Sequence, residues 1–209
     1  MSIIGIYLAA GKSKRFGKNK LLSPVGDYPL GSLALKTALD SRLDKIVVVT
    51  NEMDQLEWIH PELLRNYQKM LFHSACPKSK LGQSYSLQCG LRHAQQFEAD
   101  AVIVLLADQP LITRDMIDKI VIKYEQRRKG QNPASFIAAK YLDVSCPPIL
   151  FSDQMFEALY RLQGDKGARY LIQNKINEGI FIDFAHPKYF FDVDTKEDYM
   201  TLLQISNSM

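Results

Sequence analysis

The chain has 209 residues, of which 46% are hydrophobic, so it can bury one core of ordinary size and we expect a single domain over residues 1–209. Lys and Arg number 26 against 23 Asp and Glu, and the formal charge of +3 is too small to indicate binding to nucleic acid or a membrane. Its three cysteines show neither CxxC nor Cys/His spacing, which argues against a disulfide framework or a zinc site. The first residues place an apolar stretch before a basic one, the reverse of a secretory signal, so we expect a cytoplasmic protein.

Apolar runs of strand length alternate with segments of helical periodicity in the first two thirds of the chain. In chain order the sequence predicts a strand at 3–9, a helix at 32–43, a strand at 45–50, a helix at 85–97, a strand at 101–107 and a helix at 114–128. Strands that are apolar throughout are expected in a parallel sheet with helices on both faces. The pattern predicts a three-layer α/β/α domain with a mostly parallel, Rossmann-like sheet.

The last third of the chain is less regular. It predicts strands at 135–140 and 180–184 and helices at 153–162, 168–175 and 195–205. Thr195 and Asp198 have the spacing of a capping box at the start of the last helix.

The loop after the first predicted strand combines small residues with many cations. Its sequence, YLAAGKSKRFGKNK at residues 7–20, fits neither the Walker pattern nor GxGxxG. The small residues let backbone N–H groups approach a ligand, and the loop follows a strand at the edge where open α/β sheets bind ligands. Five basic residues could neutralise an anion: Lys12, Lys14, Arg15, Lys18 and Lys20. We expect a triphosphate site here, with a solvated basic turn as the alternative.

Five motifs in this order resemble those of one enzyme family. LAAGKSKRFGKNKLL, GQSYSLQCGL, LADQP, LQGDKGARYLI and DVDTKEDY are similar to segments of the MobA-like nucleotidyltransferases, and specifically of the molybdenum cofactor cytidylyltransferase branch, which includes accessory proteins of xanthine dehydrogenases. Phe16 stands where Met is usual. The resemblance implies a fold of the nucleotide-diphospho-sugar transferase type. It also implies that CMP is transferred from CTP to the phosphate of molybdopterin or molybdenum cofactor, with release of pyrophosphate.

The resemblance assigns charged residues to this chemistry. It implies that Arg15 contacts the leaving pyrophosphate, that Lys20 contacts the α-phosphate and that Asp108, also catalytic, binds Mg²⁺ together with Asp194. Asp108 directly follows the apolar run of a predicted central strand, and carboxylate oxygens suit Mg²⁺. The alternative for each carboxylate is a structural cap of a turn or helix.

The resemblance also implies residues that contact the two substrates. The nucleotide contacts it implies, in the first loop and in the segment from residue 82, are Leu8, Ala9, Ala10, Gly11, Lys12, Ser13, Gly82 and Ser86. Residues 82–86 are also similar to a GxSxG nucleophile elbow, but Ser86 replaces its last glycine. We expect Asp165, Lys166 and Arg169, at the start of a predicted helix, to hold the acceptor. The sequence SCPPILF lacks the glycine that the branch usually has before its PxxF element.

Several alternatives remain open at the level of sequence. Relatives that use GTP tend to carry LAGG, so Ala10 in LAAG favours CTP. A methylerythritol-phosphate cytidylyltransferase would continue with a PKQ element that is absent here, and sugar-phosphate nucleotidyltransferases share the first loop. A non-catalytic alternative is a carrier that delivers molybdenum cofactor to a xanthine-dehydrogenase-type apoenzyme. The same apoenzyme is also a candidate partner of the nucleotidyltransferase.

Overall fold

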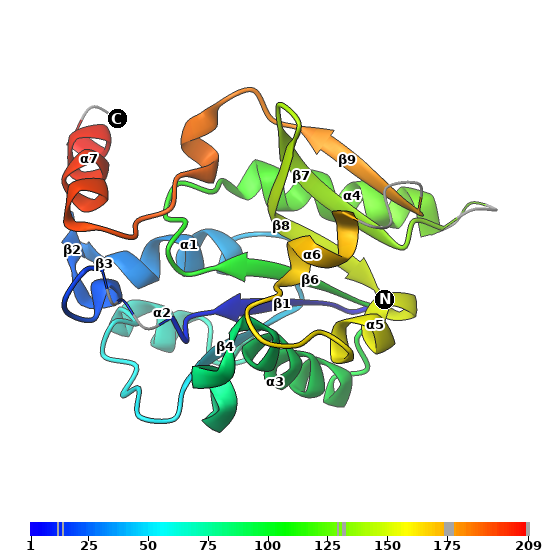
Figure 1. Ribbon diagram of the computed structural model, residues 1–209, viewed down its shortest axis with the longest axis horizontal. Coiled ribbons are helices and arrows are strands. Elements are labelled where there is room, and N and C mark those ends of the chain that lie inside the picture. Colours follow the sequence, from blue (N-terminus) through cyan, green and yellow to red (C-terminus); the bar gives the residue numbers. More distant parts are fainter. Residues whose placement is uncertain (12, 14, 129, 131–132, 174–177, 208–209) are drawn as a thin grey trace.

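The core of the computed structural model is a seven-stranded sheet of order β5-β4-β1-β6-β8-β7-β9 (Figure 1). The structure describes residues 1–11, 13, 15–128, 130, 133–173 and 178–207. The strands are β1 (Ile3–Leu8), β4 (Lys45–Asn51), β5 (Leu71–Cys76), β6 (Ala101–Leu106), β7 (Phe136–Tyr141), β8 (Val144–Ser152) and β9 (Gly179–Asp183). Only β8 runs antiparallel to its neighbours among these seven. A small hairpin of β2 (Pro24–Val25) and β3 (Tyr28–Pro29) lies apart from the sheet.

The central strand β1 is buried on both faces. Ile3 and Tyr7 belong to the core on one face of the sheet, and Ile4 and Ile6 to the core on the other, because successive side chains of a strand point in opposite directions. Leu8, the last residue of β1, is in register with Val49 and Leu106 on its two neighbours. The loops that follow β1 and β6 therefore start at the same level of one sheet edge.

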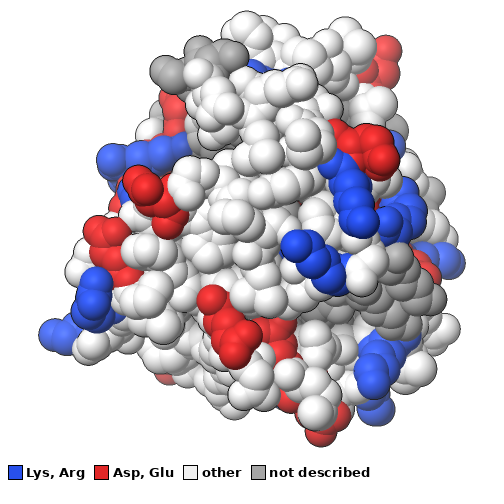
Figure 2. All heavy atoms as spheres, turned by 90° about the vertical axis from the view of Figure 1, so that its left-hand side faces the viewer, with Lys and Arg blue, Asp and Glu red and all other residues white. Residues whose placement is uncertain are grey.

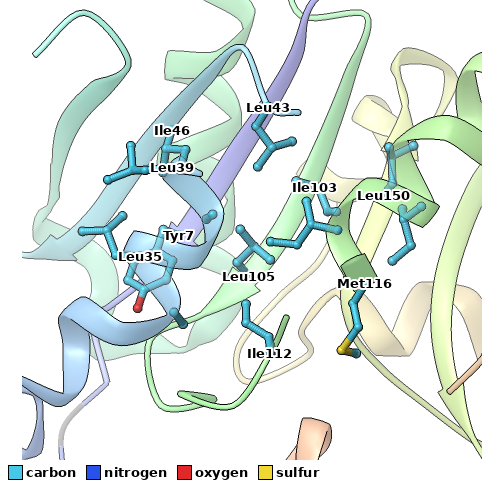
Figure 3. Packing of buried hydrophobic residues seen from close by; sticks show 14 of the residues in the cluster. Tyr7, Leu35, Leu39, Leu43, Ile46, Ile103, Leu105, Ile112, Met116 and Leu150 are labelled. Atoms are coloured by element: carbon cyan, nitrogen blue, oxygen red, sulfur yellow. The ribbon is translucent and has the colours of Figure 1, made fainter. Parts of the chain in front are cut away.

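Helices cover both faces and complete the three layers. On one face lie α1 (Leu30–Leu39), α2 (Pro61–Asn66) and α4 (Arg114–Arg128), and on the other α3 (Gln83–Gln96), α5 (Phe156–Tyr160) and α6 (Ala168–Gln173). Figure 3 shows Leu35 and Leu39 of α1 and Met116 of α4 packed with side chains of the sheet. The predicted single α/β domain with a mostly parallel sheet and helices on both faces is confirmed.

The C-terminal helix α7 (Lys196–Asn207) packs beyond the sheet edge, against the first loop. Val193 and Leu202 form a third apolar cluster with Phe16, Val25 and Leu30. The helix begins with the predicted capping box. The Thr195 N–H donates to Asp198 Oδ2 at 2.7 Å, and the Asp198 N–H donates to Thr195 Oγ1 at 3.1 Å.

The structure contains elements that the apolar patterns did not predict. β5 has exposed His73 and Ala75 because it is an edge strand, and β8 contains Pro147 and Pro148, which are uncommon inside a sheet. Short 3₁₀ helices η1 (Lys20–Leu22), η2 (Pro77–Leu81), η3 (Asp153–Met155) and η5 (Pro187–Phe190) also occur.

Three predicted helices differ clearly in extent. The one predicted at 32–43 is α1, which begins at Leu30 and ends at Leu39. The one predicted at 153–162 consists of η3 followed by α5, and the one predicted at 168–175 is α6 as far as Gln173, with its last two residues outside the described part. Within the described residues, no helix has the length and apolar character needed to cross a bilayer.

Candidate active site

A pocket of about 410 Å³ opens at the sheet edge where β1 and β6 end. Its lining comes from the ends of these strands, the first loop, η2, the start of α3 and one residue before α6: Leu8, Ala9, Ala10, Gly11, Ser13, Lys20, Leu21, Ser79, Lys80, Gly82, Gln83, Ser86, Leu106, Ala107, Asp108 and Asp165. Every predicted nucleotide-binding residue that the structure describes is in this set. Lys12 lies outside the described residues, as does Lys14.

The first loop is anchored by its own backbone. The Ser13 carbonyl accepts hydrogen bonds from the N–H groups of Phe16 at 3.1 Å and Gly17 at 3.2 Å. Phe16 is 2% exposed and its ring meets that of Tyr199 edge-on, at 5.9 Å between centroids. At Gly11 a Cβ would find no heavy atom within 4 Å, so this part of the loop presents open backbone to the pocket.

Lys20 lies between two carboxylates at the pocket rim. Its Nζ is 2.8 Å from Asp108 Oδ2 and 2.9 Å from Asp194 Oδ1, and only 7% of the side chain is exposed. Burial by itself lowers the pKa of Lys20, but the charge of Asp108 and the hydrogen bonds to Asp108 and Asp194 outweigh it and raise the pKa above its ordinary value. Lys20 therefore stays a cation at the mouth of the pocket.

Arg15 extends this cluster towards solvent. Its guanidinium Nη2 lies 2.7 Å from Asp194 Oδ2, and 70% of its side chain is exposed. The structure thus joins Arg15, Lys20, Asp108 and Asp194, four of the predicted residues, in one chain of charges. Arg15 and Asp194 are not part of the pocket lining. They are connected with it because Asp194 pairs with Lys20, which does line the pocket.

A third carboxylate, Asp192, lies beside this cluster. The Val193 N–H donates to the Asp108 carbonyl at 2.9 Å, which ties the segment before α7 to the end of β6. Part of the Asp192 side chain is open to solvent. Burial of the rest, followed by the charge of Asp108, raises the pKa of Asp192 to about 6, while a hydrogen bond with Gln109 acts to lower this pKa.

The segment before α3 is held against the loop before α6. The Ser84 hydroxyl donates to the Gly164 carbonyl at 2.8 Å, and Gly82 has a φ of +136°. A Cβ at Gly82 would lie 2.2 Å from the Gly164 carbonyl carbon, so only glycine fits this approach.

Sequence reasoning missed part of this pocket wall. Ser79, Lys80 and Gln83 line the pocket beside the predicted Gly82 and Ser86. The two lysines and the one serine of PKSK, at residues 77–80 just before the matched segment, were the available signal.

The three predicted acceptor residues are separated. Asp165 reaches the first pocket, while Arg169 lines a second one between α6 and the β7–β8 hairpin. Lys166 Nζ lies 3.2 Å from the Tyr170 hydroxyl and 4.3 Å from the centroid of its ring, so it is directed along α6.

The donors around Lys20 are hard oxygens, which Mg²⁺ prefers. Asp108 and Asp194 already share one cationic group, Lys20 Nζ, so they are close enough to act on a common cation. In the described part of the chain no cluster of three or more His, Cys, Asp or Glu side chains is placed to hold a metal, so a divalent ion would need further ligands from a substrate or from water. The buried Oε1 of Gln109 has no hydrogen-bond partner among the described residues.

Figure 2 views the face towards which β1 and β6 point. Its centre is formed mostly by uncharged residues, with both basic and acidic side chains around it.

Comparison with known proteins identifies the class that this fold and pocket belong to. A model of the MobA-like NTP transferase domain matches residues 5–179, and the chain belongs to this family of nucleotidyltransferases. It is 38% identical to the purine catabolism protein PucB of Bacillus subtilis (strain 168) over 200 residues, 94% of each chain.

The chain is also similar to a second relative and to a solved structure. A probable molybdenum cofactor guanylyltransferase of Thermococcus sibiricus is 31% identical over 125 residues, which is 59% of this chain and 57% of the relative. The crystal structure of a homologue of Mycobacterium tuberculosis rv0371c, from mycobacterium sp. strain JC1, superposes with a TM-score of 0.78 and 26% identity, covering 99% of this chain and 97% of the other.

Proposed function

We propose that this nucleotidyltransferase joins CMP from CTP to the phosphate of molybdopterin or molybdenum cofactor and releases pyrophosphate. The observation that carries the proposal is the buried Lys20, paired with Asp108 and Asp194, at the mouth of a pocket framed by the first loop. The pocket's backbone-rich wall suits a nucleoside triphosphate, and its charged rim is where an entering phosphate would meet the α-phosphorus.

The reaction brings one anion to another, so neutralising charge is the main task of the protein. Lys20 would contact the α-phosphate and the entering oxygen, and the exposed Arg15 the leaving pyrophosphate. Mg²⁺ held by Asp108 and Asp194 would supply further charge neutralisation when bound with the nucleotide. Both basic side chains are already oriented by carboxylates, which lowers the cost of arranging them during the reaction.

The choice of CTP rests on Ala10, which lines the pocket where GTP-using relatives tend to carry glycine. The acceptor and the use of the product by a xanthine-dehydrogenase-type enzyme are supported by the motif resemblance and by the similarity to a purine catabolism protein. The similarity to a probable guanylyltransferase makes GTP the second candidate nucleotide.

The test is pyrophosphate release by the purified protein with Mg²⁺ and molybdenum cofactor, comparing CTP, GTP and ATP. We expect release with CTP. Release with GTP in preference would overturn the nucleotide assignment and keep the reaction. No release with any nucleotide, together with tight binding of the cofactor, would replace the proposal by a carrier function.

A further inference from the structure

The exposed side chain of Arg15 needs support beyond its ion pair with Asp194. The Arg15 side chain is 70% exposed and that of Asp194 is 37% exposed. An exposed ion pair contributes little to the orientation of a long side chain, because water screens the charges and the side chain loses its rotamer freedom. The backbone next to Arg15 must therefore supply most of the orientation.

This backbone lies between two residues in the left-handed conformation. Ser13 has a φ of +42° and Gly17 a φ of +82°. A residue other than glycine, such as Ser13, keeps this conformation only where its surroundings hold it. The Ser13 Oγ accepts a hydrogen bond from the Lys20 N–H at 3.4 Å, so a shift of the first loop would disturb Lys20 as well as Arg15.

Phe16, the neighbour of Arg15, anchors the first loop to the C-terminal helix α7. Its ring is almost completely buried and meets the ring of Tyr199 edge-on, an arrangement that aromatic pairs favour. The Tyr199 hydroxyl donates to the Pro24 carbonyl, which fixes the Tyr199 ring between α7 and the β2–β3 hairpin. Figure 1 shows α7 and this hairpin side by side.

The same helix holds the carboxylate that faces Arg15. Asp198 Oδ2 accepts hydrogen bonds from the N–H groups of Asp194 at 3.0 Å and Thr195 at 2.7 Å, which fixes the backbone of Asp194. Helix α7 thus supports both the chain neighbour of Arg15 and its ion-pair partner. The family match ends at residue 179, so α7 lies outside it.

We propose that Tyr199 is a positioning residue, which packs on Phe16 and thereby holds the first loop where the Arg15 guanidinium binds the pyrophosphate part of a nucleoside triphosphate. The contact of Arg15 with pyrophosphate rests on the proposed function. Tyr199 is not part of the lining of the first pocket and acts through its neighbours. On this proposal α7 is a working part of the active site.

The test is a double-mutant cycle that measures binding of magnesium pyrophosphate, which requires neither a nucleobase nor an acceptor. Isothermal titration calorimetry gives the Kd for the wild-type protein, Tyr199→Leu, Arg15→Gln and the double variant. We expect each single substitution to raise the Kd about tenfold. The double variant should bind no more weakly than Arg15→Gln alone, because Tyr199 acts through Arg15. Tyr199→Phe keeps the ring and should restore most of the affinity.

Tyr160→Leu is the matched control. Tyr160 is a partly buried tyrosine of α5 whose hydroxyl donates to Gln95 Oε1 at 2.7 Å, and it lies outside the lining of the first pocket. Its replacement should leave the Kd unchanged. Thermal unfolding shows whether each variant is folded. If Tyr199→Leu is not, Tyr199→Met takes its place in the cycle, since it also removes the ring.

Three results would overturn the positioning role: an unchanged Kd for Tyr199→Leu, losses that add in the double variant, or a loss in Tyr199→Phe as large as in Tyr199→Leu. If Arg15→Gln left the Kd unchanged, the pyrophosphate contact of the proposed function would fail, and the role of Tyr199 with it. The expected cycle in a protein that releases no pyrophosphate from CTP would support the positioning role and refute the proposed reaction.

Discussion

Lys20 lies between two carboxylates that are 88 and 174 residues away from it in the sequence. Its ammonium group is almost completely buried, so its charge is balanced by these two groups more than by water. At the residue scale the function we propose depends on this cluster, and two predictions follow from its charges.

Asp108→Asn should lower kcat by about 100- to 1,000-fold, because the variant loses the charge that orients Lys20 and the metal ligand that we propose. The measurement is steady-state pyrophosphate release with Mg²⁺, with thermal unfolding to show that the fold is kept. Asp115→Asn is the control, since Asp115 is an exposed partner of Lys119 on α4. Equal losses in the two variants would contradict the assigned role.

Asp192→Asn should stabilise the metal-free protein at neutral pH. A carboxyl group with a folded-state pKa of about 6, against 3.8 in the unfolded chain, binds its proton more tightly when folded. The stabilisation that comes from this tighter proton binding is fully present below about pH 4 and is lost as the pH rises to about 6. Allowing for solvent screening, we expect the variant to be more stable by about 1 kcal/mol above pH 6.

Urea unfolding in EDTA, at about pH 4 and about pH 8, measures this difference. The two proteins should unfold alike at the lower pH and differ at the higher one. A difference of the same size at both values would show that Asp192 acts through packing instead of charge.

At the scale of elements, the pocket depends on one contact between two loops. Gly82, at the start of α3, touches Gly164 before α6, and Ser84 donates to the same carbonyl. The contact places the wall of the first pocket next to Asp165. Its geometry requires a backbone conformation that other residues rarely adopt.

Gly82→Ala should destabilise the protein by about 1–3 kcal/mol, because the added Cβ is both strained and in collision with Gly164. Denaturant unfolding provides the measurement. Gly11→Ala is the comparison, since its Cβ meets no heavy atom within 4 Å and it should keep the stability but weaken nucleotide binding. If both variants unfolded like the wild type, the loop contact would not contribute to stability.

At the scale of the whole molecule, the first pocket joins segments from distant parts of the chain. Its lining runs from Leu8 to Asp165, so a ligand that fills it binds only the folded protein. Binding should therefore stabilise the entire fold by mass action.

CTP with Mg²⁺ at about 100 times its Kd should add about 2.7 kcal/mol of stability. For a chain of this size that corresponds to a rise of roughly 5–10 °C in Tm. Thermal unfolding with CTP, GTP and ATP makes the measurement, and Lys20→Met should show a smaller shift. A shift with ATP as large as with CTP would contradict selection of the cytosine base.

Local patterns in the sequence were enough to predict the layers of the fold and part of the first pocket, namely its first loop, Gly82, Ser86 and Asp108. Buried parallel strands such as β1 and β6 are apolar along their whole length, and this signal is local. The first loop and Asp108 directly follow such strands, so their common position at one sheet edge was predictable. Edge strand β5 and proline-containing β8 lack this signal, and they were missed for that reason.

Contacts between distant side chains became visible only in the folded structure. It joined Lys20 to Asp194, brought Gly82 against Gly164, and directed Asp165 and Arg169, four residues apart, into different pockets. These contacts depend on how α6 and α7 pack against the sheet, and packing is a property of the assembled core that no local pattern of residues encodes.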